Sequence, residues 1–424
     1  MNRKNVKLGR AIACVILVLS LWGCAAIGDV DGSNAKVDWT HIRKQKQAAE
    51  MREQKLIEAN TIFGFKLFQE ILQTEGDRQN IFVSPTSVAI ALSMLSNGAE
   101  GTTSEAMAKT LEIQGIGEIN RGYGALKASL ENPDQDVQLT IANSLWARQG
   151  VPFKAEFIQK TKQFYGAKVT DLDFEDKDAA KVINGWVENN TQGKIKQIVE
   201  EVKPDDVLFL INAIYFKGRW ENEFDQYKTV PRPFYLGDGS QKSHPRMSQT
   251  DEYRYYETEE FQAVSLPYSQ RRLSLYVFLP RKQSNLKAFY QQMNAQNWEK
   301  WIVKFSKRDG RIELPRFKIE YDIELDRVLK ALGMSVAFDP RKANFSGMSE
   351  IKTNIDRVKH KTFVEVNETG TEAAAATSIG IAATSAQIPL EPSFQMIVDR
   401  PFFCAIRDNQ TGSILFMGSI VDPK

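Results

Sequence analysis

One segment near the C-terminal end constrains the fold most, because its pattern is that of a β-strand with no evident neighbour. Residues 368–384 run Glu-Thr-Gly-Thr-Glu-Ala-Ala-Ala-Ala-Thr-Ser-Ile-Gly-Ile-Ala-Ala-Thr. From Thr371 the odd positions are threonine, alanine or isoleucine, and the even positions are small or polar. Alternation with a period of two is typical of a strand with one face on a core. Side chains this small favour a strand that enters a sheet after the sheet has formed.

Two local alternatives compete with the strand, and the flanking sequence weighs against both. Four consecutive alanines favour a helix, and stretches of Ala, Ser, Gly and Thr often form plain linkers. However, strands are predicted at residues 361–367, 402–407 and 414–421, the last two around a turn at 408–412. A linker would join two domains, and too little chain remains after it to form one. No proline occurs from Thr371 until Pro389, so the backbone keeps its N–H donors.

Motifs spread along the whole chain resemble those of one family. They are Asn80-Ile-Phe-Val-Ser-Pro-Thr-Ser87, Asn184-Gly-Trp-Val-Glu188 with Thr191 and Lys194-Ile195, Asn212-Ala-Ile-Tyr-Phe-Lys-Gly-Arg-Trp220, Leu314-Pro-Arg-Phe317, and Asp399-Arg-Pro-Phe402 followed by Phe416-Met-Gly418. From about Glu50 to Lys424 the chain resembles a serpin, and residues 368–377 are similar to the hinge of the inhibitory members. The order of the motifs carries the resemblance, more than any one of them.

The resemblance implies an α+β serpin fold for residues 50–424. Such a fold is a single large domain with three β-sheets, about nine helices and an exposed reactive-centre loop, here at about 368–392. Length alone would have allowed two or three domains in 424 residues. The 42% of hydrophobic residues suffice for a sizeable core. Apolar residues between Ala59 and Leu72 predict one buried helix, and Ser84-Pro85 predicts the start of another over 86–96.

Site residues carried over from the family fall into four groups. The hinge comprises Glu368, Gly370, Thr371, Glu372, Ala373, Ala374, Ala375 and Ala376. The bait bond is Thr384-Ser385, with Ala383-Thr384 and Ala382-Ala383 as alternatives. The polar cluster called the shutter comprises Ser84, Ser87, Asn212 and His360. Trp220 would lie at the breach, where the loop enters the sheet.

The shutter and breach residues also have purely structural interpretations, which stay open. Buried polar groups need partners, so His360 is equally well explained as a satisfied core histidine with no switching role. A tryptophan such as Trp220 is more often simply part of the core.

The N-terminus has the features of an export signal. Basic residues between Arg3 and Arg10 precede an apolar stretch, and Leu21-Trp-Gly-Cys24 resembles a bacterial lipoprotein cleavage box. We therefore expect residues 1–23 to be a signal peptide, Cys24 to carry lipid, and residues 24–49 to be a tether, with a solvated helix over 44–55. An ordinary secretion signal and an uncleaved anchor are the alternatives. The expected location is the cell envelope, lipid-anchored, or outside the cell.

Composition argues against several function classes. Basic and acidic residues nearly cancel, at 55 and 53, and no basic run is interleaved with aromatics as on a nucleic-acid surface. The three histidines show no metal-binding spacing, and no hydrolase G-x-S-x-G or phosphate-binding motif occurs. With Cys24 lipidated and Cys14 removed, Cys404 remains, in an apolar run typical of a small core residue. We expect no enzyme activity, no cofactor, no metal and a monomer.

The resemblance implies suicide inhibition of a serine protease. The residues after Gly370 would form an exposed bait loop, and the cut loop would insert into the central sheet with the protease still attached as a covalent acyl complex. No lysine or arginine lies between Thr371 and Asp399, so small apolar residues point to elastase-like or subtilisin-like targets. The alternatives are a non-inhibitory serpin-fold binding protein of the envelope and, less consistent with the motifs, a hydrolase acting through His360.

Overall fold

The computed structural model describes residues 39–76, 78–131, 135–371 and 394–424. Residues 47–424 form one compact unit. The helices are α1 (Trp39–Glu75), α2 (Pro85–Ser96), α3 (Gly101–Thr110), α4 (Ile119–Glu131), α5 (Ala155–Lys160), α6 (Ala179–Asn190), α7 (Leu286–Gln292), α8 (Ala295–Ile302) and α9 (Asp326–Leu329), with short π or 3₁₀ turns at Thr161–Tyr165, Gln226–Lys228, Lys330–Met334 and Ser335–Phe338. None of the helices in these ranges is long and apolar enough to cross a membrane.

Six strands form the central sheet, in the order β10-β11-β12-β4-β2-β3. Their bounds are β2 (Val137–Arg148), β3 (Lys168–Leu172), β4 (Leu208–Arg219), β10 (Phe317–Glu324), β11 (Arg357–Asn367) and β12 (Gly370–Thr371). Strands β4 and β11 also pair directly and in parallel, from Phe209 opposite Arg357 to Tyr215 opposite Phe363. The two-residue β12 separates them only at one end.

The other strands form a nine-stranded sheet, β1-β15-β14-β8-β7-β6-β9-β13, with β5 paired to β6. Their bounds are β1 (Ile81–Val83), β5 (Val230–Tyr235), β6 (Gln241–Glu257), β7 (Phe261–Pro267), β8 (Leu273–Pro280), β9 (Ser306–Pro315), β13 (Phe394–Ile397), β14 (Phe402–Asp408) and β15 (Ile414–Ile420). The 17-residue β6 pairs with β5 and β9 along most of its length and with β7 at its end. Two of the three predicted sheets are thus joined through β6.

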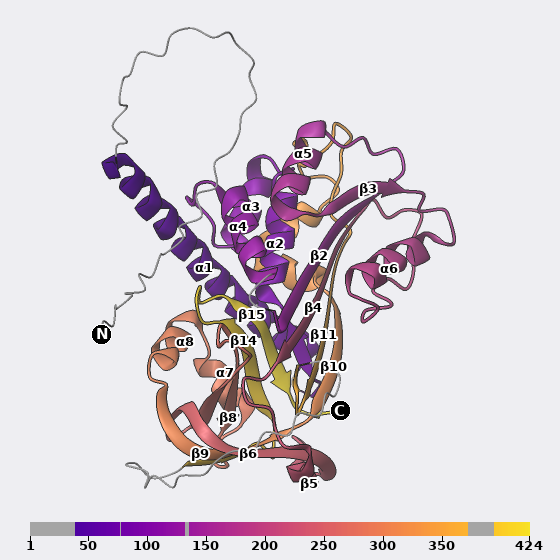
Figure 1. Ribbon diagram of the computed structural model, residues 1–424. Coiled ribbons are helices and arrows are strands. Elements are labelled where there is room, and N and C mark those ends of the chain that lie inside the picture. The colour runs from indigo at the N-terminus through magenta and orange to yellow at the C-terminus, as the bar shows by residue number, and fades with distance from the viewer. Residues whose placement is uncertain (1–38, 77, 132–134, 372–393) are drawn as a thin grey trace, which may run out of the picture. The chain divides into compact units, whose positions relative to one another are not determined.

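Helices cover both faces of the central sheet. Figure 1 shows α2, α3 and α4 on one side of β2 and β4, and α6 on the other. Alternate residues of β4 account for this: Phe209 and Ile211 pack with Ile183 of α6, whereas Leu210 and Ile214 belong to the larger core. Because both faces are buried, β4 is a nearly continuous apolar run.

The elements predicted from local sequence patterns within the described residues are present, whereas the strand predicted from Thr371 onward lies outside them after Thr371 itself. The strands expected around the alanine-rich segment lie within β11, β14 and β15. The expected buried helix is the second half of α1, where Phe63, Leu67 and Phe68 have no exposed surface. Helix α2 begins at Pro85, with the Ser84 side chain accepting the Ser87 N–H as its N-cap. Cys404 is fully buried, and burial raises the pKa of its thiol.

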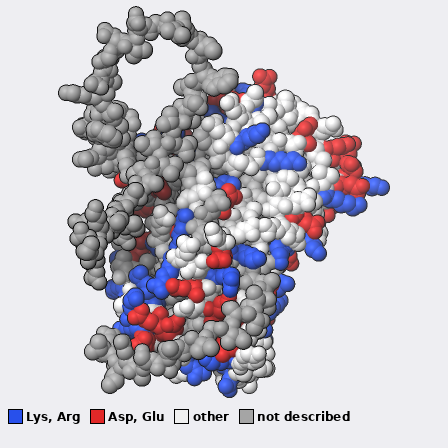
Figure 2. All heavy atoms as spheres, viewed as in Figure 1, with Lys and Arg blue, Asp and Glu red and all other residues white. Residues whose placement is uncertain are grey.

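Lysine, arginine and acidic side chains are interspersed over the described surface shown in Figure 2. Many of them form pairs of opposite charge, such as Arg121 with Glu118 and Lys181 with Asp178. Exposed pairs of this kind contribute little to stability.

Candidate functional site

The start of the predicted loop is already a strand of the central sheet. After β11 the chain turns at Glu368 and Thr369 and returns as β12 between β11 and β4, antiparallel to both. Thr371 lies opposite Val366 on β11 and Gly218 on β4. The sequence analysis expected exposure to begin directly after Gly370, but Thr371 has no exposed surface, because the two neighbouring strands enclose it.

Position 370 requires glycine for two reasons. Its φ of +150° lies in a region that other residues rarely adopt, and a Cβ atom there would lie 2.0 Å from the carbonyl oxygen of Gly218. Any larger residue would therefore push β12 away from β4.

The Thr371 hydroxyl is held by a buried tyrosine. Its Oγ1 lies 2.7 Å from the hydroxyl of Tyr268, which is fully buried. Tyr268 in turn stacks on Trp220, with ring centroids 4.5 Å apart and planes 13° apart. Burial raises the pKa of Tyr268, so the phenol stays neutral and can hydrogen-bond with the threonine. The sequence analysis did not identify Tyr268.

Trp220 fastens the turn between β11 and β12. Its indole Nε1 donates to the carbonyl oxygen of Asn367 at 2.9 Å, and its backbone N–H donates to that of Thr369 at 3.0 Å. The Phe224 N–H donates to the carbonyl oxygen of Glu368 at 2.9 Å. Trp220 thus lies where the loop meets the sheet, and it does more than fill space in the core.

The Glu368 side chain is a buried carboxylate with a specific cation. Only 3% of the residue is exposed, and its Oε1 accepts from Arg316 Nε at 2.7 Å and Nη2 at 2.6 Å, and from Thr229 Oγ1 at 2.5 Å. Arg316 connects β9 to β10, so the carboxylate ties the turn to two further parts of the chain. The sequence analysis quoted Arg316 within a motif without giving it a role. A buried glutamate needs a cation as its partner, and this requirement is the signal that could have pointed to Arg316.

The four predicted shutter residues come together beneath β4 and β11. His360 Nε2 accepts the N–H of Ser84 at 3.0 Å, and His360 Nδ1 lies 2.6 Å from Asn212 Oδ1. The Asn212 side-chain amide donates to Ser87 Oγ at 2.7 Å. It also donates to Asn143 Oδ1 at 2.5 Å, and Asn143 was not predicted. Each partner is buried, so the cluster is a polar network inside the core, in which Asn143 Nδ2 has no hydrogen-bond partner among the described residues.

These contacts fix the state of the His360 ring. Because Nε2 accepts from a backbone N–H, the ring proton must lie on Nδ1, where it donates to Asn212. A second proton on Nε2 would face the Ser84 N–H donor, and the charge would be fully desolvated. Burial accordingly lowers the pKa of His360 to about 3. The imidazole is therefore neutral at physiological pH.

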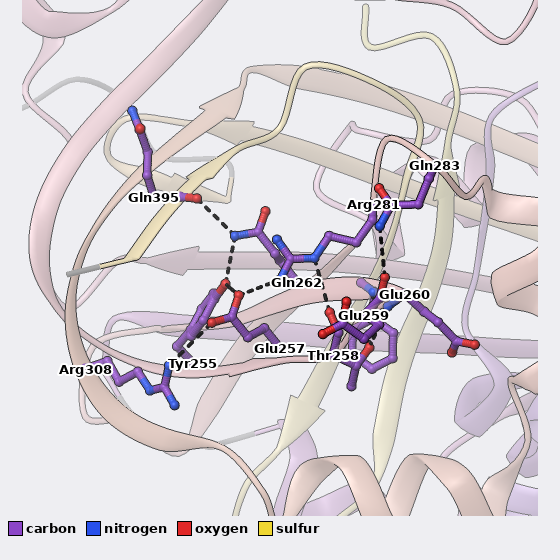
Figure 3. Close-up of polar contacts among 11 residues, drawn as sticks. Tyr255, Glu257, Thr258, Glu259, Glu260, Gln262, Arg281, Gln283, Arg308 and Gln395 are labelled. Atoms are coloured by element: carbon purple, nitrogen blue, oxygen red, sulfur yellow. Dashed lines mark hydrogen bonds and ion pairs between the residues drawn. The ribbon is translucent and has the colours of Figure 1, made fainter. Parts of the chain in front are cut away.

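The far end of the loop is anchored in the nine-stranded sheet. Phe394, the first residue of β13, stacks on Tyr255 with centroids 3.8 Å apart, over Gly310. Gln262 donates to Tyr255 Oη at 2.7 Å and to the carbonyl oxygen of Gln395 at 3.0 Å. Figure 3 shows the Gln262 amide between the Tyr255 hydroxyl and the backbone of Gln395, with Arg281 and Arg308 paired to the Glu257 carboxylate nearby.

The hinge and this anchor thus hold the two ends of the loop on different sheets. The remaining predicted hinge residues, Glu372 and Ala373 to Ala376, lie outside the described residues. The bait bond Thr384-Ser385 and the lipid site Cys24 do so too.

The two histidines whose side chains the structure describes, His244 and His360, both make structural contacts. Within the described residues, no three His, Cys, Asp or Glu side chains gather as a metal site would require. His244 Nε2 lies 2.6 Å from the carbonyl oxygen of Arg316, and burial lowers its pKa. His360 has no serine hydroxyl on either ring nitrogen, because one nitrogen accepts from a backbone N–H and the other meets Asn212.

Comparison with known proteins gives the class of the chain. Residues 58–423 match the family model of the serpins, described as serine protease inhibitors. The chain is 35% identical over 383 residues to the human leukocyte elastase inhibitor, covering 87% of this chain and 100% of that protein. The chain belongs to the serpin family.

Two solved structures show the same fold. Tengpin, a thermophilic serpin in its native state, superposes with a TM-score of 0.80 at 32% identity, covering 87% of this chain and 94% of tengpin. Human thyroxine-binding globulin, complexed with thyroxine, has a TM-score of 0.80 at 29% identity, covering 88% and 100%.

Replacing Glu368 with glutamine should destabilise the hinge. The glutamine would keep the shape of the side chain but leave Arg316 without its buried counter-charge, at a cost of about 1 to 3 kcal/mol. Thermal unfolding measures the loss, with Glu320→Gln as the control, since Glu320 is an exposed carboxylate on β10. Equal melting temperatures in the two variants would show that the Arg316 contact is not stabilising.

Acid should weaken the shutter through His360. The pKa of His360 in the folded chain, about 3, lies below the usual 6.5. The stability that the neutral imidazole contributes is therefore fully present above pH 6.5 and is lost as the pH falls toward 3. One extra proton on the unfolded chain corresponds to about 1.4 kcal/mol per pH unit. Urea unfolding between pH 7 and 4 should show a steeper loss for the natural chain than for His360→Gln. Parallel curves would contradict the neutral, proton-excluding ring.

Proposed function

We propose that this serpin inhibits serine proteases as a suicide substrate, by inserting its cut loop between β4 and β11. One observation carries the proposal: β12 already lies between these strands and is hydrogen-bonded to both. The hinge therefore has the position and direction that a longer inserted strand would need.

If the observed register continued, the loop residues would lie on the faces that their sizes suit. With Thr371 opposite Gly218 and Val366, Ala373 would lie opposite Phe216 and Ala375 opposite Ile214. The two isoleucines, at 379 and 381, would lie opposite Leu210 and Leu208. These β4 residues all face the larger core, so the odd positions of the loop would be buried. Small residues would come first, beside the bulky Phe216.

Insertion requires the β4–β11 pairing to open. Seven residue pairs, from Phe209–Arg357 to Tyr215–Phe363, would separate, and each strand would regain its hydrogen bonds from the new strand. The same extrapolated register would bring Thr377 opposite both Asn212 and His360. The direct bond between His360 and Asn212 would therefore break, and the Thr377 hydroxyl would lie between them. We infer that the shutter alternates between these two arrangements.

The chemistry belongs to the protease. Its serine oxygen attacks the bait carbonyl, the C–N bond breaks, and the amine of the downstream peptide leaves with a proton from the protease histidine. The loop carboxyl group then remains esterified to the serine. The thirteen residues from Thr371 to Ala383 span about 43 Å at about 3.3 Å per residue. Carried over that distance, the protease loses the geometry it needs for hydrolysis; insertion of a serpin loop is an established instance of such an order change.

Target choice follows from the loop sequence. The absence of lysine and arginine between Thr371 and Asp399 removes the cation that a trypsin-like pocket would bind. Small residues around Thr384-Ser385 suit elastase-like or subtilisin-like enzymes. The similarity to an elastase inhibitor supports this assignment.

A second function draws on the similarity to thyroxine-binding globulin, which shares the fold and binds a small ligand. In that case the chain would be a non-inhibitory binding protein of the cell envelope. The inhibitory proposal is preferred because nothing charged or branched at Cβ stands at 373–376, the residues that would enter the sheet first after Glu372.

We also propose that the chain is exported and held at a membrane as a monomer. The support is the signal-like segment 1–23 and the cleavage box before Cys24. Intact-mass analysis of the N-terminus, in cells that process lipoproteins, should find Cys24 lipidated as the first residue. An unmodified Cys24 would contradict the lipid anchor and leave the inhibitor proposal untouched.

Incubation with elastase or subtilisin should give a covalent adduct that survives a denaturing gel. Protease whose serine has been blocked beforehand should give none, because no acyl bond can form. Mass spectrometry should show that the released C-terminal peptide begins at Ser385. Complete cleavage without adduct would favour the binding-protein alternative, and a cut only after a basic residue would refute the target class.

Ala373→Arg should convert the inhibitor into a substrate, because Thr371 is already buried in the uncut chain and position 373 is the next core-facing position that has to enter the sheet. A buried, unpaired guanidinium opposes insertion by several kcal/mol, so the trapped fraction should fall more than about tenfold. The matched control is Glu372→Arg, because position 372 would lie opposite half-buried Lys217, on the other face of the sheet. If both variants trap protease equally well, the register argument is wrong.

A further inference from the structure

A hollow on the nine-stranded sheet has the composition of an anion site. It has a volume of about 400 Å³ and lies over β5, β6 and β9. Its charged lining residues are Lys228, Arg232, Arg246, Arg311 and Glu313. Four cations therefore surround one carboxylate, in a space within the usual size range of small-ligand pockets.

Strand register brings these side chains to one face. Arg246 on β6 lies opposite Val230 on β5, and Arg232 follows two residues later on the same strand. On β9, Glu313 lies opposite Ser248, which is two residues from Arg246. Because side chains two residues apart share a face, three neighbouring strands present their charges to the same hollow.

The carboxylate does not satisfy the cations around it. Glu313 Oε1 lies 2.8 Å from Arg311 Nη2, and its Oε2 lies 3.2 Å from Arg246 Nε. The negative charge of Asp399 also stabilises the Arg246 cation, but Asp399 Oδ1 already forms an ion pair with Arg400 Nη1, at 2.7 Å. The lining keeps an excess of positive charge after these pairs are formed.

Arg246 supplies independent evidence for a missing anion. The residue is 9% exposed, and its buried Nη1 has no hydrogen-bond partner among the described residues. A buried guanidinium is normally paired on each edge, since its donors cannot be satisfied by apolar neighbours. Desolvation lowers the pKa of Arg246, in the direction expected for a cation short of counter-charge.

We propose that this hollow binds a small anion bearing two or more oxyanion groups, bridging the Arg246 guanidinium to Arg232 and Lys228. A planar guanidinium binds carboxylate or phosphate oxygens in pairs, and the exposed Arg232 and Lys228 can reach a second group. This proposal does not rest on the proposed loop insertion. The hollow bridges β5, β6 and β9, and β9 carries the loop anchor β13, so a bound anion stabilises the sheet beside that anchor.

Isothermal titration of the full chain with pyrophosphate and with succinate tests the site and separates phosphate from carboxylate ligands. Sodium chloride at matched ionic strength serves as the reference. Saturable binding of either anion, one per chain, is the expected result and identifies the class. Bound anion should also raise the melting temperature by mass action. No saturable binding of either anion above the chloride reference would overturn the proposal.

Substitutions locate the site. Arg232→Gln should weaken binding about tenfold, as expected for one charge-assisted contact, and Arg246→Gln should abolish it. Arg232 is exposed, so its variant carries the test if Arg246→Gln fails to fold. Lys181→Gln is the control, because it removes the same charge from the surface of α6. Equal affinity in Arg232→Gln and Lys181→Gln would show that the anion binds elsewhere.

Discussion

The structure depends on the direct, parallel pairing of β4 with β11. These strands lie at the centre of a sheet buried on both faces, and their hydrogen bonds end where β12 begins. Beyond Tyr215 and Phe363 the two strands no longer pair with each other, and the hinge occupies the gap. The pairing closes the sheet in the native chain and has to open before a longer strand can enter.

Two groups of side chains contact this pairing, one at the end where β12 begins and one in the middle of the paired region. At the open end, Trp220, Tyr268 and Arg316 fasten the turn and the first two residues of the inserted strand. Along the paired region, His360 and Asn212 bond directly across the strands. Under the proposed mechanism the first group would guide entry of the loop and the second would oppose it. The distal anchor at Phe394 keeps the other end of the loop on a different sheet.

Much of this arrangement could be predicted from the sequence, for identifiable reasons. Period-two patterns located β11, β14 and β15, and the order of motifs gave the family and brought Ser84, Ser87, Asn212 and His360 together. The burial of Thr371 could not be predicted, because it depends on where two distant strands separate. Arg316, Thr229, Tyr268 and Asn143 were missed because each is far in sequence from its partner. No local pattern marks such contacts, although a buried glutamate and a buried asparagine each imply a partner.

The central claim is that the loop becomes a strand between β4 and β11 once it is cut. Hydrogen–deuterium exchange, followed by mass spectrometry on the intact and the cut chain, tests it most directly. The account predicts that amides from 372 to about 382 exchange quickly before the cut and as slowly as the interior of β4 after it, with β12 protected in both states. Fast exchange of 372–382 after the cut, with unchanged protection in β4 and β11, would contradict it.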